Sequence, residues 1–396
     1  MVLSRLLNCA ALLLVFLPVS SAEAQAPPSK TQGAAAAPPS PLAVPLPPAT
    51  DQPPPEVPLP DPIPIGPGSL VSGALDTRTR TADTGRKGGF WLNTAELDIQ
   101  HNITHHRTAL GNVYLQILSE DPPDIAHGRD IQIGEAYVTY RLPVEADFNS
   151  TAYVKAGQFR IPFGLLAVYD PHLQILQPLN AQSLGVRLDF GLAVSGRLYG
   201  YLNYDFSLTT GTGPNHIDFN PSQVVCFRLG RTFTTRNGVV NIGGSLLQGR
   251  LPVTDLSGDN PFAVELPSSG RVRADRIANG ERFVSKSRIA ADVSYGYNRV
   301  TARGEAVAGA DKDQRILGYY AEGNYRFTPR LSAAVASSLF VYPTGNSTAT
   351  RESLGLTYAS SRNLTVRGLF QYLRDVPRDE SGQVRHRFTV QLLLRF

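Results

Sequence analysis

The sequence predicts an all-β protein, a transmembrane antiparallel β-barrel of about 16 strands that follows a Pro-rich N-terminal segment. Three observations lead to this prediction. Apolar and polar residues alternate in many short segments, and the connections between these segments alternate between long and short. The chain also ends on an alternating segment whose last residue is Phe396. Together these features favour a closed sheet in a membrane over the half-buried strands of a soluble protein.

The composition favours strands over helices. The 396 residues are 42% hydrophobic and only 18% charged, and they include 35 Gly, 16 Tyr and 17 Phe but one Trp and one Met. Gly, Tyr, Phe, Val and Thr in short alternating runs are typical of many strands joined by turns. The net charge of +4 is too small to support a nucleic-acid-binding function by itself.

The N-terminus predicts export followed by a tether. Residues 1–24 have the layout of a secretory signal peptide, with Arg5, an apolar stretch from Cys9 to Val19 and small residues at the cleavage positions. Residues 25–67 are dominated by Pro, Ala and Ser, and we expect a disordered or polyproline-II periplasmic segment there. A spacer is the simpler interpretation, and an arm that touches the cell wall or a partner is the alternative. The barrel is expected over residues 68–396.

The final strand shows the alternation most clearly. Phe388, Val390, Leu392, Leu394 and Phe396 share one face, while Arg387, Thr389, Gln391 and Arg395 share the other. The same pattern recurs at residues 186–195, 288–297 and 317–327. After the signal peptide no run of about 18 apolar residues could form a transmembrane helix, so a membrane location has to come from strands.

The connections between these segments alternate in length. Residues 161–185, 211–222, 251–282 and 375–385 are long connections, whereas 197–200, 234–237, 297–298 and 360–363 are short ones. Residues 143–150 are an exception, because this connection lies on the side of the short turns but is eight residues long. Long outer loops and short periplasmic turns are the expected asymmetry of outer-membrane barrels. An even number of strands then puts both ends of the barrel on the periplasmic side.

The expected inner face is polar and charged in both signs, which indicates a water-filled lumen, because such charges are costly when buried dry or turned to lipid. About 16 strands enclose an aqueous channel, whereas about eight leave room for side chains only. The expected inward charges are Glu96, Asp98, Glu135, Arg141, Arg187, Asp189, Arg228, Lys286, Arg288, Asp292, Arg303, Glu305, Glu322, Arg326, Arg367 and Arg387. Aromatic residues expected at the water interface are Phe90 with Trp91, Tyr325 with Phe327, Phe340 with Tyr342, and Phe396.

The third outer connection, residues 161–185, differs from the other long ones because it contains the apolar pieces Leu165–Val168 and Leu173–Leu176. We expect it to fold inward against the barrel wall and to narrow the lumen, since functional loops are often packed. An outer cap or a contact between subunits is the alternative.

Two motifs next to this loop resemble the phosphate-selective porin O/P family. They are Gly134–Tyr140, which spells GEAYVTY, and Val154–Leu165, which spells VKAGQFRIPFGL. The close match covers about thirty residues, and the rest of the barrel matches in pattern only. The resemblance implies an outer-membrane homotrimer and assigns residues 161–185 to the constriction. Phosphate selectivity does not follow, because carboxylates near the loop would cancel part of a positive potential.

The candidate residues for the pore constriction and for ion binding combine basic wall residues with polar residues of the third loop. Lys155 is a weaker candidate, because Tyr153 and Phe159 on its face are expected to turn toward lipid. The candidates are Arg160, Tyr169, Asp170, His172, Arg187, Asp189, Arg228, Arg288 and Arg303.

Catalytic, cofactor and metal functions find no support in the sequence. His101, His105 and His106 cluster at an expected periplasmic turn, where solvated histidines are commoner than metal ligands. Cys226 is alone after the signal peptide, so no intrachain disulfide is expected. No phosphate-binding glycine loop, dinucleotide fingerprint or zinc spacing is present.

The leading hypothesis is a porin that passes small hydrophilic solutes or inorganic anions by passive diffusion, with at most a weak anion preference. Its expected partners are these solutes, outer-membrane lipid and two further copies of the chain. The alternative is a structural or adhesive barrel with a plugged lumen, in which the outer loops and the Pro-rich segment carry the function.

Overall fold

The computed structural model describes residues 60–80, 89–105, 108–120, 130–143, 150–167, 176, 184, 187–213, 215, 223–236, 238–252, 283–312, 314–341, 348–374 and 385–396. Every described residue belongs to one compact unit within Pro45–Phe396. The expected signal peptide and most of the expected Pro-rich segment lie outside the described residues.

The described chain is built from strands, with one short 3₁₀ turn, η2, at Gly164–Ala167. Strand β1 spans Ile63–Gly66 and precedes the barrel. The barrel strands are β2 (Ser69–Arg80), β3 (Gly89–His105), β4 (Thr108–Glu120), β5 (Asp130–Leu142), β6 (Thr151–Arg160), β7 (Leu188–Leu198), β8 (Leu202–Thr209), β9 (Val224–Thr235), β10 (Gly238–Pro252), β11 (Phe283–Tyr297), β12 (Val300–Asp311), β13 (Gln314–Arg326), β14 (Leu331–Val341), β15 (Thr348–Ala359), β16 (Leu364–Arg374) and β17 (Arg385–Arg395).

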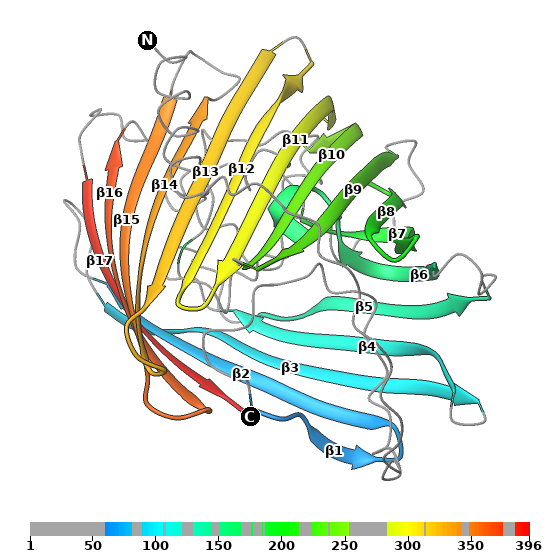
Figure 1. Ribbon diagram of the computed structural model, residues 1–396, viewed down its shortest axis with the longest axis horizontal. Coiled ribbons are helices and arrows are strands. Elements are labelled where there is room, and N and C mark those ends of the chain that lie inside the picture. The colour runs from blue at the N-terminus through cyan, green and yellow to red at the C-terminus, as the bar shows by residue number, and fades with distance from the viewer. Residues whose placement is uncertain are drawn as a thin grey trace, which may run out of the picture. The chain divides into compact units, whose positions relative to one another are not determined.

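Consecutive strands from β2 to β17 pair antiparallel, and β17 pairs back with β2, so the sheet closes on itself (Figure 1). Closure satisfies the backbone N–H and C=O groups inside the sheet, which hydrocarbon cannot do. The expected fold class is confirmed: the barrel contains 16 strands. Among the described residues, no helix has the length and apolar character needed to cross a membrane.

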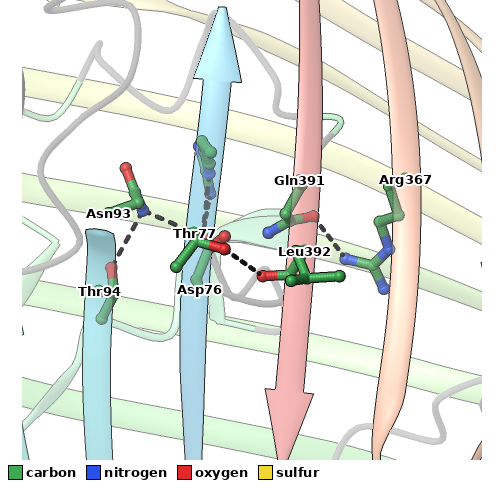
Figure 2. Close-up of polar contacts among 8 residues, drawn as sticks. Asp76, Thr77, Asn93, Thr94, Arg367, Gln391 and Leu392 are labelled. Atoms are coloured by element: carbon green, nitrogen blue, oxygen red, sulfur yellow. Dashed lines mark hydrogen bonds and ion pairs between the residues drawn. The ribbon is translucent and has the colours of Figure 1, made fainter. Parts of the chain in front are cut away.

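The seam between β17 and β2 is held by backbone and side-chain contacts (Figure 2). Thr77 Oγ1 donates to the Leu392 carbonyl oxygen at 3.3 Å. Next to it, the Asp76 carboxylate accepts from Arg78 Nε at 2.9 Å and from Asn93 Nδ2 at 3.0 Å. The arginine and the amide therefore fix the carboxylate on the inner face of the seam.

The C-terminal residue closes the seam at its periplasmic end. Phe396 N donates to the Gly73 carbonyl at 3.1 Å, and Gly73 N donates to the Phe396 carbonyl at 2.9 Å. A Cβ at Gly73 would lie 2.6 Å from the Phe396 ring, so only glycine leaves room for the ring here. The terminal aromatic residue thus has a specific seat on β2.

The outer face of the barrel is apolar and the inner face is not, because side chains alternate along each strand. On β10, Leu246 is 53% exposed while its neighbour Leu247 is 2% exposed. On β17, Leu392 is 41% exposed while Gln391 is completely buried, as the sequence predicted for this strand. Other large apolar residues on the exposed outer face include Phe206, Phe227, Ile289, Val335, Leu354 and Phe370. An exposed apolar surface all round the barrel fits contact with lipid.

Two sequence expectations need correction. Ile63–Gly66 pairs with the start of β2, with Ile63 opposite Val71, so strand pairing is present before the expected boundary at residue 68. Phe340 was expected in an outer aromatic belt, but it is 2% exposed and packs inside the barrel. Tyr325 and Phe327 do lie on the exposed face, with ring centroids 5.1 Å apart.

Candidate pore lining and third loop

The described parts of the third loop lie inside the barrel. Ile161, Phe163 and Leu184 are 1%, 1% and 0% exposed. They share one apolar cluster with inward side chains of the wall, and in Figure 1 the short turn after β6 lies within the ring of strands. The wall residues of this cluster, carried by β9 to β15, are Val224, Cys226, Leu247, Leu251, Ala290, Val307, Ile316, Phe340 and Ala349.

Polar contacts hold the loop to the same wall. Gly164 N donates to Ser245 Oγ on β10 at 2.9 Å, and Leu165 N donates to the Glu305 carboxylate on β12. Gly164 has φ +53, and a Cβ there would collide with that carboxylate. At the other end of the loop, Lys286 Nζ on β11 donates to the Leu184 carbonyl at 3.2 Å. The expected inward fold is therefore present in the described parts of the loop.

A second apolar cluster extends the contact toward the C-terminal strands. Leu165 and Leu176 pack with Tyr320 on β13, Ala336 on β14 and Leu369 on β16. The described residues of the loop thus contact inward apolar side chains on strands from β9 to β16. Since β4 is eight strands from β12 in either direction around the ring, the loop's anchor at Glu305 lies across the lumen from β4.

Three of the candidate arginines have carboxylate partners. Arg160 Nε lies 2.7 Å from Glu135 Oε1, and Arg228 Nη2 lies 2.6 Å from Asp292 Oδ1. Gly243 on β10 lies between β9 and β11, and the absence of a side chain there lets the second pair form across it. Arg288 is bound by Asp311 and also donates to the Ala310 carbonyl at 2.8 Å.

Asp189 binds backbone rather than facing open lumen. It is fully buried, and its carboxylate accepts from Gly211 N at 2.6 Å, Gly213 N at 3.2 Å and Thr210 Oγ1 at 2.9 Å. These contacts fix the start of the loop after β8. Asp189 therefore has a structural role in this arrangement.

The remaining candidates are placed only in part. Arg187 is buried where the third loop rejoins the wall, and its carbonyl accepts from Ile161 N at 3.0 Å. Arg303 on β12 belongs to the inner face, opposite Glu322 on β13 and Ser294 on β11. Tyr169, Asp170 and His172 lie outside the described residues.

Two walls of the lumen differ in their charge. On β14 to β17, as described, the inner face carries Arg351, Arg367 and Arg387 and no carboxylate, and Figure 2 shows Arg367 Nη1 donating to Gln391 Oε1 at 3.2 Å. The only acid of these strands, Glu352, is exposed on the outer face, where it accepts from Ser337 Oγ at 2.9 Å.

The wall of β3 to β6 is instead mixed and aromatic. Tyr114 and Tyr137 stack with centroids 5.2 Å apart, and Lys155 Nζ lies 4.4 Å from the Tyr137 ring centroid. Lys155 thus shares the inner face with Tyr153 and Phe159, which are 7% and 1% exposed, so the expectation that these two rings turn to lipid is wrong. Tyr114 and Tyr137 were not predicted to face the lumen, although Tyr137 alternates in step with Glu135 and Arg141 along β5.

The described residues contain no group of three or more His, Cys, Asp or Glu placed to hold a metal ion. Cys226 is buried, and its Sγ lies 3.4 Å from the Pro162 carbonyl oxygen of the third loop. It therefore belongs to the packing between loop and wall.

No family model and no curated protein matches the chain. Solved structures do. The chain is similar to an anion-selective porin from Comamonas acidovorans, with a TM-score of 0.59 and 12% identity over 83% of this chain and 99% of that one. It is similar to Salmonella typhi OmpF, with a TM-score of 0.58 and 11% identity over 83% of this chain and 98% of that one.

The outer-membrane channel DcaP of Acinetobacter baumannii is also similar, with a TM-score of 0.53 and 9% identity over 83% of this chain and 98% of that one. Identities this low establish the fold alone. The protein thus has the fold of the outer-membrane porins, a closed 16-strand β-barrel.

Proposed function

We propose that the protein is a porin, a water-filled channel through which small hydrophilic solutes and inorganic ions diffuse across the outer membrane without covalent chemistry. The observation that carries this proposal is the third loop, which packs against one side of a charged lumen in a 16-strand barrel. A loop held against one wall narrows such a lumen and leaves the facing wall to water.

We further propose a weak preference for anions. The inward arginines of β14 to β17 support it, because that wall has no compensating carboxylate on its own strands. The paired Arg160, Arg228 and Arg288 contribute less, since Glu135, Asp292 and Asp311 neutralise them. Arg187 and Arg303 complete the proposed set of basic residues near the constriction.

Membership of the phosphate-selective porin O/P family and assembly as a homotrimer remain part of this proposal. The two motifs beside the third loop support the family. A similar structure, OmpT of Vibrio cholerae, is described in a trimer form, which supports the assembly. Chemical cross-linking of the purified protein in detergent tests the assembly. Products that stay at the mass of a single chain would contradict a trimer.

Single-channel recording in planar bilayers tests the channel itself. We expect discrete current steps and, in a KCl gradient, a zero-current potential on the anion side. Arg160→Glu and Arg187→Glu should each move that potential toward cations. Absence of steps would favour the rival function, a structural or adhesive barrel with a plugged lumen.

A further inference from the structure

The wall that faces the third loop carries a set of groups that the ion-channel proposal does not use. The loop is anchored on β10 to β12, and β4 lies across the lumen from β12. Tyr114 is near the middle of β4, Tyr137 near the middle of β5 and Asp98 near the middle of β3. A solute that passes the loop therefore passes this wall.

The acceptors on this wall are held in place by neighbouring side chains. Asp98 Oδ1 accepts from Tyr114 Oη at 2.6 Å and from Gln116 Nε2 at 3.2 Å. Glu135 Oε1 is held by Arg160 Nε at 2.7 Å. Fixed carboxylates bind a ligand with less loss of side-chain freedom than mobile ones.

The inner face of this wall carries charges of both signs. Glu96, Asp98 and Glu135 are inward acids of β3 and β5, and Arg141, Lys155 and Arg160 are inward bases of β5 and β6, so acids and bases stand side by side. Such a wall attracts neither anions nor cations strongly, but it is dense in hydrogen-bond donors and acceptors.

The two tyrosines add rigid apolar surface among these polar groups. Their rings stack at 5.2 Å with an interplanar angle of 29°. Directly opposite Tyr137 on β6 stands Gly157, which has no side chain, and Lys155 of the same strand places its Nζ 4.4 Å from the Tyr137 ring centroid. Apolar ring surface bordered by fixed polar groups is the usual lining of a small-molecule site.

Neutral ring-shaped solutes rich in hydroxyl groups match this combination. Their hydroxyls can donate to Asp98 and Glu135 and accept from Lys155, while their C–H faces contact the tyrosine rings. We propose that the β3–β6 wall, through Tyr114, Tyr137 and Asp98, is a contact site for pyranose sugars on their way through the lumen. This inference rests on the proposed channel function.

The test is block of the single-channel current by added maltotriose, recorded with the full chain in planar bilayers. We expect the wild-type current to fall with a half-blocking concentration that rises about 3- to 10-fold in Tyr114→Leu and in Asp98→Ala. Tyr140→Leu, on the outer face of the same sheet region, and Gln371→Ala, a lumenal amide on β16, are the matched controls and should keep the wild-type value.

Tyr114→Phe keeps the ring but loses the hydrogen bond to Asp98, so we expect a smaller rise in the half-blocking concentration. This variant replaces Tyr114→Leu in the test if Tyr114→Leu does not assemble. Open channels that maltotriose does not block, or that sodium benzoate blocks instead, would overturn the inference and leave the channel standing. An equal rise in Gln371→Ala would also overturn it. A protein that forms no channels at all would refute the proposed function.

Discussion

The walls formed by β14–β17 and by β3–β6 line the same lumen but differ in chemistry. The first presents Arg351, Arg367 and Arg387 without an inward acid on its described strands, whereas the second places acids beside bases around Tyr114 and Tyr137. On this difference rest our proposals that one wall favours anions and that the other offers hydrogen bonds to neutral solutes. The charge of a single residue therefore predicts ion selectivity less well than the distribution of charges over each wall does.

The seam joins these two walls, so the largest expected effect comes from breaking it. In Gly73→Val the new side chain overlaps the Phe396 ring and the Glu96 carbonyl, each 2.6 Å from a Cβ, and β17 cannot pair fully with β2. We expect most of the protein to fail to form the compact, heat-modifiable barrel on gels. Gly323→Val, whose Cβ would meet its nearest atom at 3.9 Å, is the control. Normal folding of both variants would contradict the proposed role of the Phe396–Gly73 contact in closing the barrel.

Reversing charge on the arginine wall should change selectivity next most strongly. Arg351→Glu combined with Arg387→Glu places acids on a wall that has none, so the zero-current potential in a KCl gradient should move to the cation side. Arg315→Glu, at the outer end of β13, is exposed and should leave the potential close to that of the wild type. A double variant that keeps its anion preference would remove this wall from the selectivity path.

Lifting the third loop from its wall should have a moderate effect. Gly164→Leu puts a side chain at φ +53 and against the Glu305 carboxylate, with a strain of about 1–3 kcal/mol. The loop should move toward the β3–β6 wall and lower the single-channel conductance. Unchanged conductance in a folded Gly164→Leu channel would mean that the loop does not narrow the passage.

The smallest shift is expected where charges are already paired. Arg228→Gln with Asp292→Asn removes one charge of each sign from a pair 2.6 Å apart, so the net charge of the lumen is unchanged. The zero-current potential should stay within experimental scatter of the wild type, in contrast to the change at Arg351 and Arg387. A clear shift would show that Arg228 acts on ions separately from Asp292.

The sequence predicted the barrel because a period of two is visible within each strand. Leu392 and Gln391 follow this period, and their outer and inner faces were predicted correctly. Phe340 was misassigned because Val341 beside it is also apolar, so the local pattern does not say which of the two turns inward. The contact of Leu247 and Val307 with the third loop could not be predicted, since an inward apolar side chain has no sequence signature until its partner is known.

The site was harder to predict than the fold. The apolar pieces of the third loop indicated that it would pack inward, but not that Ser245, Lys286 and Glu305 would hold it. The Arg228–Asp292 pair joins β9 to β11 across Gly243, and no local spacing reveals such a pair. Ion pairing therefore reduces the attraction for anions of several arginines that were predicted from the sequence as anion sites.

The most direct test of the account is single-channel recording of the full chain in a planar bilayer under a KCl gradient. An open lumen with an arginine wall predicts discrete current steps whose zero-current potential lies on the anion side and crosses to the cation side in the Arg351→Glu, Arg387→Glu variant. A folded barrel that gives no steps would contradict the account.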